Sequence, residues 1–345
     1  MTTKVLVWGA GAIGGTVGAF LARAGHEVTF VDVLPLHVAA ISDPALGLAV
    51  DGPVAQFTVT APAFLPQELA GRWELILLCV KGQDTASASR ALMPHLAEDG
   101  AVVSMQNGLC ARLAEDVLGK GRVVAASFNF AGDWIKPGHV LFGARGALAL
   151  GELDGRETDR VARIVALLRD FEPAATASSD IQSWIWGKLG FGAMLTAHAV
   201  GQASIIDCFN RPELIPLWRR LGDEIAAIAS RQGAHPHAFD AYDPAAFTLA
   251  ASEDATREGV KRLVEFSRHG AKTHSGIWRD LAVHRRRTEV SAQLGPVVDI
   301  GRAHRLDCPT LSRLLWMLGE IEAGKRRQDD LNLNELMTGE MSPVG

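Results

Sequence analysis

The chain of 345 residues is about twice the usual length of a single domain, which favours two domains. Hydrophobic residues make up 48% of it, which excludes a disordered chain, and 34 basic against 39 acidic residues give a net charge of −5, which argues against a general nucleic-acid binder. The longest apolar run, Leu75–Val80, is too short to cross a bilayer, so no membrane partner is expected.

The first 150 residues alternate short apolar runs with helical patterns. Continuous apolar strands separated by helices predict a parallel sheet that is covered on both faces. Three further strands in quick succession predict a mixed region near residue 150. The predicted strands are Lys4–Trp8, Glu27–Val31, Leu75–Val80, Ala101–Ser104, 122–127, 138–142 and 147–151, and the helices are 12–24 and two that begin near Asp84 and Leu109.

The pattern becomes almost wholly helical after residue 178. The sequence therefore predicts an α/β fold in which an N-terminal Rossmann domain with a doubly wound parallel sheet, residues 1–178, precedes an all-α domain, residues 179–337. Residues 338–345 are predicted to be a frayed tail.

A glycine fingerprint follows the first predicted strand and opens the first helix. In Gly9-Ala-Gly11-Ala12-Ile13-Gly14, Gly9 permits a tight turn, Gly11 lets a pyrophosphate approach the backbone, and Gly14 allows close helix–strand packing. The position inside a βαβ unit predicts a dinucleotide site. The alternative is a strand–helix turn that needs glycine and binds nothing.

Asp32 ends the second strand, 18 positions after Gly14. An acidic residue there accepts hydrogen bonds from the adenosine ribose and repels a 2′-phosphate. Residues 33–36 contain no Arg or Lys, so NAD is predicted rather than NADP. The alternative is that Asp32 only makes a turn hydrogen bond at the end of the strand.

The start of the chain and the cysteines favour the cytoplasm. Residues 1–4 lead directly into a strand pattern, so no signal peptide is predicted. The cysteines lie far apart with no CxxC and no Cys/His cluster, which predicts reduced thiols and no metal site. They are Cys79, Cys110, Cys208 and Cys308.

Five further segments, together with the fingerprint, give a resemblance to a known family. The chain resembles the ketopantoate reductase (2-dehydropantoate 2-reductase) family from residue 4 to about residue 322. The segments are Leu78-Cys-Val-Lys81, Gln106-Asn107-Gly108-Leu109, Trp186-Gly-Lys188-Leu189, Arg287-Thr288-Glu289 and Cys308-Pro309-Thr310. The resemblance implies a Rossmann domain, a helical domain like the C-terminal one of 6-phosphogluconate dehydrogenase, and a homodimer. It also implies reduction of a 2-oxo acid by NADPH in the cleft between the domains.

The resemblance assigns roles to four residues. Lys188 is expected to be the catalytic acid, with Glu289 near it, while Lys81 contacts the cofactor and Asn107 lies beside the nicotinamide and the substrate. The chemistry agrees, because an ammonium stabilises the negative charge that hydride addition builds on oxygen and supplies the proton. The alternatives are a lysine that extends along an apolar helix to water, and a solvated Glu289 paired with Arg285 or Arg286.

Two departures from the family pattern predict a different substrate. The family carries asparagines four and eight residues after the lysine, where this chain has Gly192 and Thr196. Both lie on the Lys188 face of a helix, so the change removes polar contacts and opens space. The family's substrate-binding serine segment reads here as His274-Ser275, and either residue is a candidate substrate contact.

Two further features bear on the substrate. His198, ten residues after Lys188, could act as a base but is more typical of a core histidine. Between Arg257 and Arg287, nine basic and three acidic residues give a local excess of +6, a candidate field for a small anion.

The sequence thus predicts an NAD-dependent oxidoreductase that interconverts a small 2-hydroxy acid, or a related secondary alcohol, and its ketone. The alternatives are an NADPH-dependent 2-dehydropantoate 2-reductase proper, an opine- or imine-type reductase, and a non-catalytic regulator that binds the cofactor.

Overall fold

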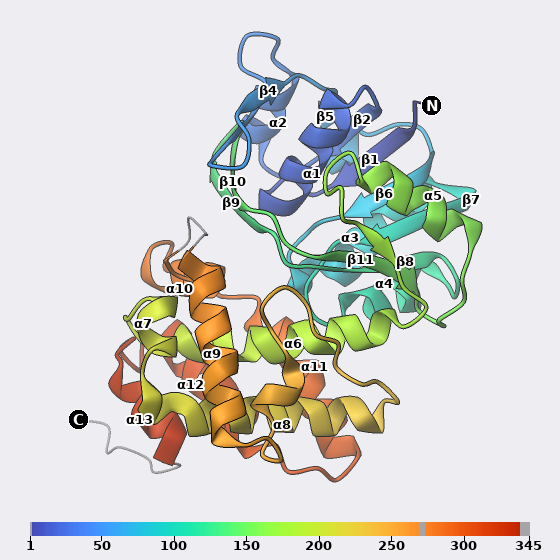
Figure 1. The fold of residues 1–345 in the computed structure, drawn as a ribbon. Coiled ribbons are helices and arrows are strands. Elements are labelled where there is room, and N and C mark those ends of the chain that lie inside the picture. The colour runs from blue at the N-terminus through green and yellow to red at the C-terminus, as the bar shows by residue number, and fades with distance from the viewer. Residues whose placement is uncertain (1, 269–272, 339–345) are drawn as a thin grey trace. The chain divides into compact units, whose positions relative to one another are not determined.

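The computed structural model describes residues 2–268 and 273–338 (Figure 1). The chain divides into two compact units, Met1–Ile181 and Gln182–Gly345. Each unit is built around its own kind of secondary structure, strands with helices in the first and helices in the second.

An eight-stranded sheet forms the centre of the first unit, in the order β12-β11-β8-β7-β6-β1-β2-β5. Its strands from β8 to β5 are parallel, whereas β11 runs antiparallel to β8, and β12 is parallel to β11. The strands are β1 (Lys4–Trp8), β2 (Glu27–Val31), β5 (Ala63–Phe64), β6 (Trp73–Leu78), β7 (Leu96–Ser104), β8 (Val123–Phe128), β11 (Leu148–Glu152) and β12 (Thr176–Ala177). The predicted parallel sheet with a late mixed region is confirmed, and only the short edge strands β5 and β12 were not predicted.

Helices cover both faces of this sheet. Val5 and Val7 of β1 belong to the hydrophobic core that includes helices α1 and α5, while Leu6 and Trp8, which point to the other face, are equally buried. Successive strand residues point to opposite faces, so burial of all four shows that both faces of the sheet are covered, as in a doubly wound fold. The helices of this unit are α1 (Ala12–Arg23), α2 (Pro35–Ser42), α3 (Thr85–Leu92), α4 (Cys110–Leu118) and α5 (Asp159–Leu168), with short 3₁₀ turns at 66–68, 82–84 and 93–95.

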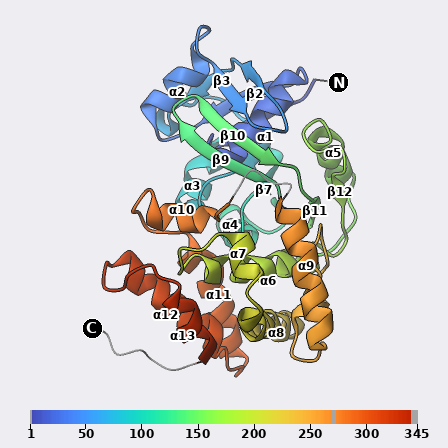
Figure 2. The same ribbon diagram turned by 60° about the vertical axis from the view of Figure 1, so that its left-hand side comes forward.

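A second sheet of four strands, which the sequence analysis did not predict, packs on α1 (Figure 2). Its order is β4-β3-β10-β9. The segment 138–142, which is predicted as one of the three strands of the late mixed region, belongs instead to this sheet. Its strands are β3 (Leu48–Asp51), β4 (Phe57–Val59), β9 (Ala131–Lys136) and β10 (His139–Ala144).

The turn of the β9–β10 hairpin contains residues that are typical of turns and could have indicated it. Pro137 and Gly138 join β9 to β10, and Gly138 has φ +71°, which favours glycine. Strand β9 begins with Ala131-Gly132-Asp133, and glycine and aspartate are depleted in strands, so periodicity alone does not reveal it.

The second unit is all-helical, as predicted. Its first helix, α6, is apolar on nearly every side and is buried along most of its length. The helices are α6 (Ile181–His198), α7 (Ile205–Phe209), α8 (Ile215–Arg231), α9 (Glu253–Arg268), α10 (Gly276–Ala282), α11 (Val290–Ala303), α12 (Pro309–Glu322) and α13 (Leu331–Thr338), with 3₁₀ turns at 212–214 and 244–247.

Three smaller outcomes complete the fold. Thr338 still belongs to α13, so the predicted tail begins one residue too early, and residues 339–345 lie outside the described part of the chain. The four cysteines form no disulfide bond. Among the helices that the structure describes, none combines the length and apolar character needed to span a bilayer.

Candidate active site

The first unit brings the predicted cofactor residues to one edge of its sheet. Gly9 follows β1, Asp32 follows β2, Lys81 comes three residues after β6, and Asn107 follows β7. Since these strands are parallel neighbours, all four residues lie at their carboxyl ends. Strand β1 is where the chain switches sides of the sheet, and ligands of doubly wound folds bind at such a switch point.

The fingerprint glycines have three distinct environments. Gly9 has φ +100°, and a Cβ there would lie 3.0 Å from the backbone of Cys79. A Cβ on Gly14 would lie 2.0 Å from the carbonyl oxygen of Gly9, so only glycine allows α1 to pack this closely. Within the part of the chain that the structure describes, a Cβ on Gly11 would meet nothing within 4 Å, which leaves an open approach to the N-terminus of α1. Ala12 and Ile13 form the first turn of that helix.

The carboxylate of Asp32 is bound to two backbone amides. Its Oδ2 accepts from Ala10 N at 2.9 Å, and its Oδ1 accepts from Leu34 N at 3.0 Å. Asp32 therefore makes turn hydrogen bonds at the end of its strand, as the alternative to cofactor binding requires. Each carboxylate oxygen also keeps a second lone pair that can accept from a ribose hydroxyl. The side chains of Val33 and Leu36 are 73% and 74% exposed, so an apolar surface without a cation follows the carboxylate.

Gln106 ties two of these strand ends together and was missed by the sequence analysis. Its Nε2 donates to Val80 O at 3.0 Å and to Thr85 Oγ1 at 2.8 Å, while Ser104 Oγ donates to its Oε1 at 3.0 Å. The loop that carries Lys81 is thereby fixed beside the turn that carries Asn107. A polar residue directly after an apolar strand was the available signal.

The residues at this edge fit a dinucleotide. The space beside Gly11 would be filled by a Cβ, and the buried Oδ1 of Asn107 has no hydrogen-bond partner within the described residues. Buried polar atoms are almost always paired in folded proteins, so an unpaired acceptor at the same sheet edge as the open glycine turn points to a ligand that donates.

Helix α6 of the second unit carries the predicted catalytic lysine. Trp184, Lys188 and Gly192 recur every four residues along one face and are half-buried, in contrast to their fully buried neighbours. A Cβ on Gly192 would meet no atom of the described residues within 4 Å, so the position one helical turn after Lys188 faces open space. Thr196, one turn further on, is 1% exposed.

Glu289 lies at the start of α11 and is half-buried. The residue before it is anchored from another helix, because Thr288 N and Thr288 Oγ1 both donate to Glu322 Oε1, at 2.8 and 2.6 Å. Glu322 is the last residue of α12 and was missed by the sequence analysis, since 34 residues separate the partners. This contact fixes the backbone that carries Glu289.

Ser275 and His274 have structural partners inside the second unit. Ser275 Oγ accepts from Trp278 N at 3.2 Å and caps α10. The ring of His274 stacks on Trp278 with centroids 3.9 Å apart, and its nitrogens contact Thr273 Oγ1 and Gln202 O. Both residues thus stabilise the local fold, which the sequence analysis did not foresee.

Family models match both units of the chain. The model described as ketopantoate reductase PanE/ApbA matches residues 5–155, and the model of its C-terminal domain matches residues 180–322. The chain belongs to the ketopantoate reductase PanE/ApbA family. It is therefore a member of an oxidoreductase family, as the resemblance implied.

Curated members of the PanE/ApbA family align along nearly the whole chain. The 2-dehydropantoate 2-reductase of Archaeoglobus fulgidus is 28% identical over 325 residues, which cover 93% of this chain and 98% of that protein. The 2-dehydropantoate 2-reductase of Halobacterium salinarum is 28% identical over 320 residues, with 90% and 96% covered.

Solved structures give the same fold. The PanE/ApbA family ketopantoate reductase from Ralstonia eutropha has a TM-score of 0.76 at 27% identity and covers 93% of this chain and 99% of its own. A ternary structure of D-mandelate dehydrogenase with NADH and anilino(oxo)acetate has a TM-score of 0.79 at 18% identity, with the same coverage. At that identity the second likeness shows the fold alone.

The basic segment of this PanE/ApbA member is partly neutralised locally. Arg257, Lys261 and Arg268 pair with glutamates on their own helix α9, as solvated helix faces do. Arg286 pairs with Asp280 at 2.7 Å. Lys272, one of the nine basic residues, lies outside the described residues.

His198 is buried at the end of α6. It is 1% exposed, and its ring centroid lies 5.7 Å from that of His274. Burial, and secondarily the charge of His274, lower the pKa of His198 to about 4, although backbone groups of Ala203 and Leu195 partly oppose the shift. The ring is therefore neutral at physiological pH, as expected of a core histidine.

The stability of the protein is expected to depend on His198 at acidic pH. A histidine whose pKa is depressed by folding contributes stability above its unfolded pKa of about 6.5, and that stability is lost as the pH falls towards 4. The contribution is about 3 kcal/mol of unfolding free energy. Urea unfolding at pH 7.0 and 4.5 measures it, and His198→Leu should show a shallower pH dependence; an unchanged slope would contradict the assignment.

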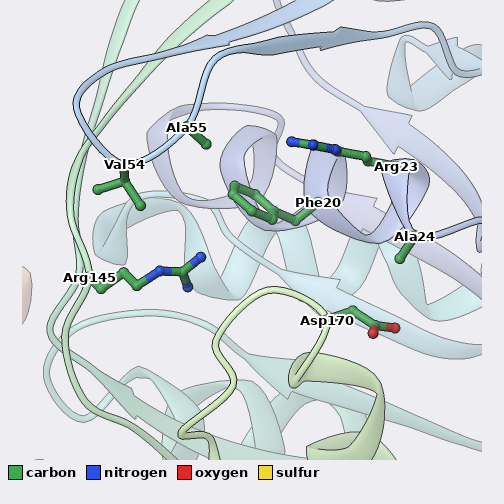
Figure 3. A pocket seen from close by; sticks show the side chains of 7 residues that line it. All are labelled: Phe20, Arg23, Ala24, Val54, Ala55, Arg145 and Asp170. Carbon is green, nitrogen blue, oxygen red and sulfur yellow. The ribbon is translucent and has the colours of Figure 1, made fainter.

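A solvent-open groove of about 400 Å³ lies elsewhere in the first unit, between α1 and the β3–β4 loop (Figure 3). The guanidinium carbon of Arg145 lies 5.8 Å from the centroid of the Phe20 ring, whereas that of Arg23 lies 4.5 Å from the centroid of the Phe57 ring. None of the predicted site residues lines this groove, and it sits at the C-terminal end of α1, away from Gly11. Within the described residues, no three His, Cys, Asp or Glu side chains gather as a metal site.

Proposed function

We propose that the protein is an NAD-dependent oxidoreductase that interconverts a 2-hydroxy acid, or a related secondary alcohol, and its ketone. The observation that carries the proposal is Lys188, which stands half-buried on an apolar helix beside the open space at Gly192. A lysine in such surroundings is a candidate acid–base group because its ammonium is only partly solvated. The dinucleotide edge of the first unit supports the same proposal.

Each group of the chain has a defined task in this reaction. The fingerprint turn, Asp32, Lys81 and Asn107 would hold NAD, which when bound would supply the hydride acceptor for oxidation of the alcohol and, as NADH, the hydride donor for reduction of the ketone. Lys188 Nζ gives its proton to the carbonyl oxygen during reduction and removes the hydroxyl proton during oxidation. Glu289 supplies a carboxylate that favours the charged lysine, and Glu322 holds the backbone of Glu289 through Thr288.

Cofactor preference is proposed to follow from Asp32. Its carboxylate would accept from the ribose hydroxyls and repel a 2′-phosphate, and no cation follows in residues 33–36. The D-mandelate dehydrogenase of the same fold was solved with NADH, so this fold accommodates that cofactor.

Asp32→Asn is expected to shift the ratio of NADPH to NADH affinity toward NADPH by about tenfold or more, because the amide removes the repelling charge. Fluorescence titration of both reduced cofactors measures the two dissociation constants. Asp170→Asn, an aspartate of the same unit at the other end of α1, is the control and should leave the ratio unchanged. Tighter binding of NADPH than NADH by the unaltered protein would refute the cofactor assignment.

The substrate is proposed to be larger than ketopantoate near Gly192. The resemblance places asparagines at the positions of Gly192 and Thr196, and here the first is replaced by open space and the second by a buried threonine. A site without those polar anchors favours a bulkier or more apolar substituent.

A substrate panel tests the proposed reaction. Aliphatic and aromatic 2-hydroxy acids are assayed with NAD, and their 2-oxo acids and ketopantoate are assayed with NADH and NADPH. We expect turnover of a 2-hydroxy acid with NAD, and Gly192→Asn should reduce the rate with bulky substrates more than with small ones. Absence of turnover with every pair would reject an oxidoreductase of this class.

A second candidate is 2-dehydropantoate 2-reductase itself. It is favoured by the curated relatives of that name, which match 90% to 94% of this chain. Efficient reduction of ketopantoate with NADPH in the same panel would select this function and show that Gly192 does not exclude it.

A further inference from the structure

A buried histidine of helix α2 contacts the backbone of the glycine fingerprint. His37 lies in α2 and is 0% exposed. Its Nε2 lies 2.8 Å from the carbonyl oxygen of Ala10, and its Nδ1 accepts from Gly138 N at 2.8 Å. The three groups belong to segments 27 and 101 residues apart in the chain.

These two contacts fix the tautomer of the ring. A backbone N–H can only donate, so Nδ1 must be the acceptor from Gly138. The proton of the neutral ring is therefore on Nε2, which donates to the Ala10 carbonyl. Both partners are held in turn, since Ala49 N donates to Gly138 O at 2.8 Å and Ala10 N donates to Asp32 at 2.9 Å.

The Ala10 carbonyl belongs to the peptide group that joins Ala10 to Gly11. A trans peptide is planar, so fixing the carbonyl direction also fixes the Gly11 N–H, which points the opposite way. The open space beside Gly11 is where the fingerprint admits a phosphate. Asp32 and His37 thus hold the two peptide groups that flank Ala10, one through the N–H and one through the carbonyl.

We propose that His37 is a positioning residue of the dinucleotide site, which holds the Ala10–Gly11 peptide in the orientation that presents its amide to the cofactor pyrophosphate. The β9–β10 turn, through Gly138, keeps the ring in the required tautomer. The inference rests on the proposed function in one respect, that this edge binds a dinucleotide.

Two substitutions separate the two hydrogen bonds. His37→Gln places an amide near the position of Nε2 and can still donate to Ala10 O, whereas the shorter His37→Asn places one near Nδ1 and can still accept from Gly138 N. The two variants are matched in polarity and each loses one buried bond. A purely structural role predicts that they lose NADH affinity equally; a positioning role predicts that only Asn does.

The experiment is titration of NADH into each variant, with thermal unfolding as the measure of structural damage. We expect the dissociation constant of His37→Asn to rise about ten- to a hundredfold and that of His37→Gln to stay within about threefold of the unaltered protein. His26→Asn is the control, because His26 also bridges two distant segments, Thr3 and Asp170, but away from the fingerprint. Equal losses in the two His37 variants, or unchanged affinity in both, would overturn the inference.

A measurement on the unaltered protein covers the case in which a variant does not fold. Nitrogen NMR of the labelled imidazoles should show the Nε2–H tautomer for His37, and a protonated Nδ1 would overturn the proposal. The outcomes also separate the two proposals. If the protein binds NADH but turns over no substrate, the proposed reaction is rejected and the role of His37 stands. If it turns over a substrate, but the His37 variants lose NADH affinity only in proportion to their lower unfolding temperatures, the reaction stands and the role of His37 is rejected.

Discussion

Replacing Lys188 by alanine is expected to lower kcat by about 10²- to 10⁴-fold, the usual contribution of a positioned general acid or base. The lysine lies beside open space on an apolar helix, so alanine removes the ammonium without creating a clash. Because Lys188 does not belong to the sheet edge that carries the glycine fingerprint and Asp32, the dissociation constant of NADH should change little. Steady-state kinetics with the substrate found in the panel, together with NADH titration, measures both effects.

Lys261→Ala is the matched control for this prediction. Lys261 lies on α9 of the same unit and pairs with Glu258 at the surface, so its loss should leave kcat and stability nearly unchanged. A Lys188→Ala variant with unaltered kcat would remove the lysine from the mechanism. Rescue of its rate by added primary amines would instead support a role in proton transfer.

The sheet edge that carries the glycine fingerprint could be predicted because its features depend on residues that are close together in the sequence. A strand, a tight turn and a helix follow one another within residues 4–23, and each glycine answers a requirement set by its neighbours in the chain. Asp32, Lys81 and Asn107 follow apolar strands that could be recognised from the sequence, so their arrival at one edge follows from parallel pairing.

The supporting contacts could not be predicted because they join distant segments. Gln106 reaches the loop after β6, Glu322 reaches Thr288, and His37 links Ala10 to Gly138. No periodicity in the sequence reports a hydrogen bond between residues that only the folded chain brings together. The unpredicted second sheet belongs to this class, since β3 pairs with β10 across about 90 residues.

The helical unit shows a different difficulty, because residue types that suggest a ligand contact were visible in the sequence but their structural role was not. The family resemblance predicts His274 and Ser275 as substrate contacts, and in the structure both take part in capping and packing α10. A side chain that stabilises a helix terminus and one that binds a ligand draw on the same residue types. Only the partners that the fold supplies distinguish the two.

Gly11→Ala is expected to weaken NADH binding by about ten- to a hundredfold while leaving the fold intact. A Cβ at this position would touch no atom of the described residues within 4 Å, and the methyl group projects into the space proposed for the pyrophosphate. The residue is the N-cap of α1 with φ −67°, an ordinary value for alanine, and the cost in unfolding free energy is about 1 kcal/mol. NADH titration and urea unfolding measure the two effects separately.

Two further glycines make this prediction discriminating. In Gly14→Ala the new Cβ would lie 2.0 Å from Gly9 O and 2.8 Å from Val7 Cγ1, so that variant should lose about 3 kcal/mol of stability through overpacking. Gly319→Ala lies on α12, where a Cβ also meets nothing within 4 Å, and should gain slight stability without affecting NADH. Stability and cofactor affinity should therefore change separately. Gly11→Ala should lose affinity with only a small loss of stability, Gly14→Ala should lose stability first, and Gly319→Ala should lose neither. If Gly11→Ala bound NADH as the unaltered protein does, the fingerprint would be a strand–helix turn that needs glycine for its geometry and not for a ligand.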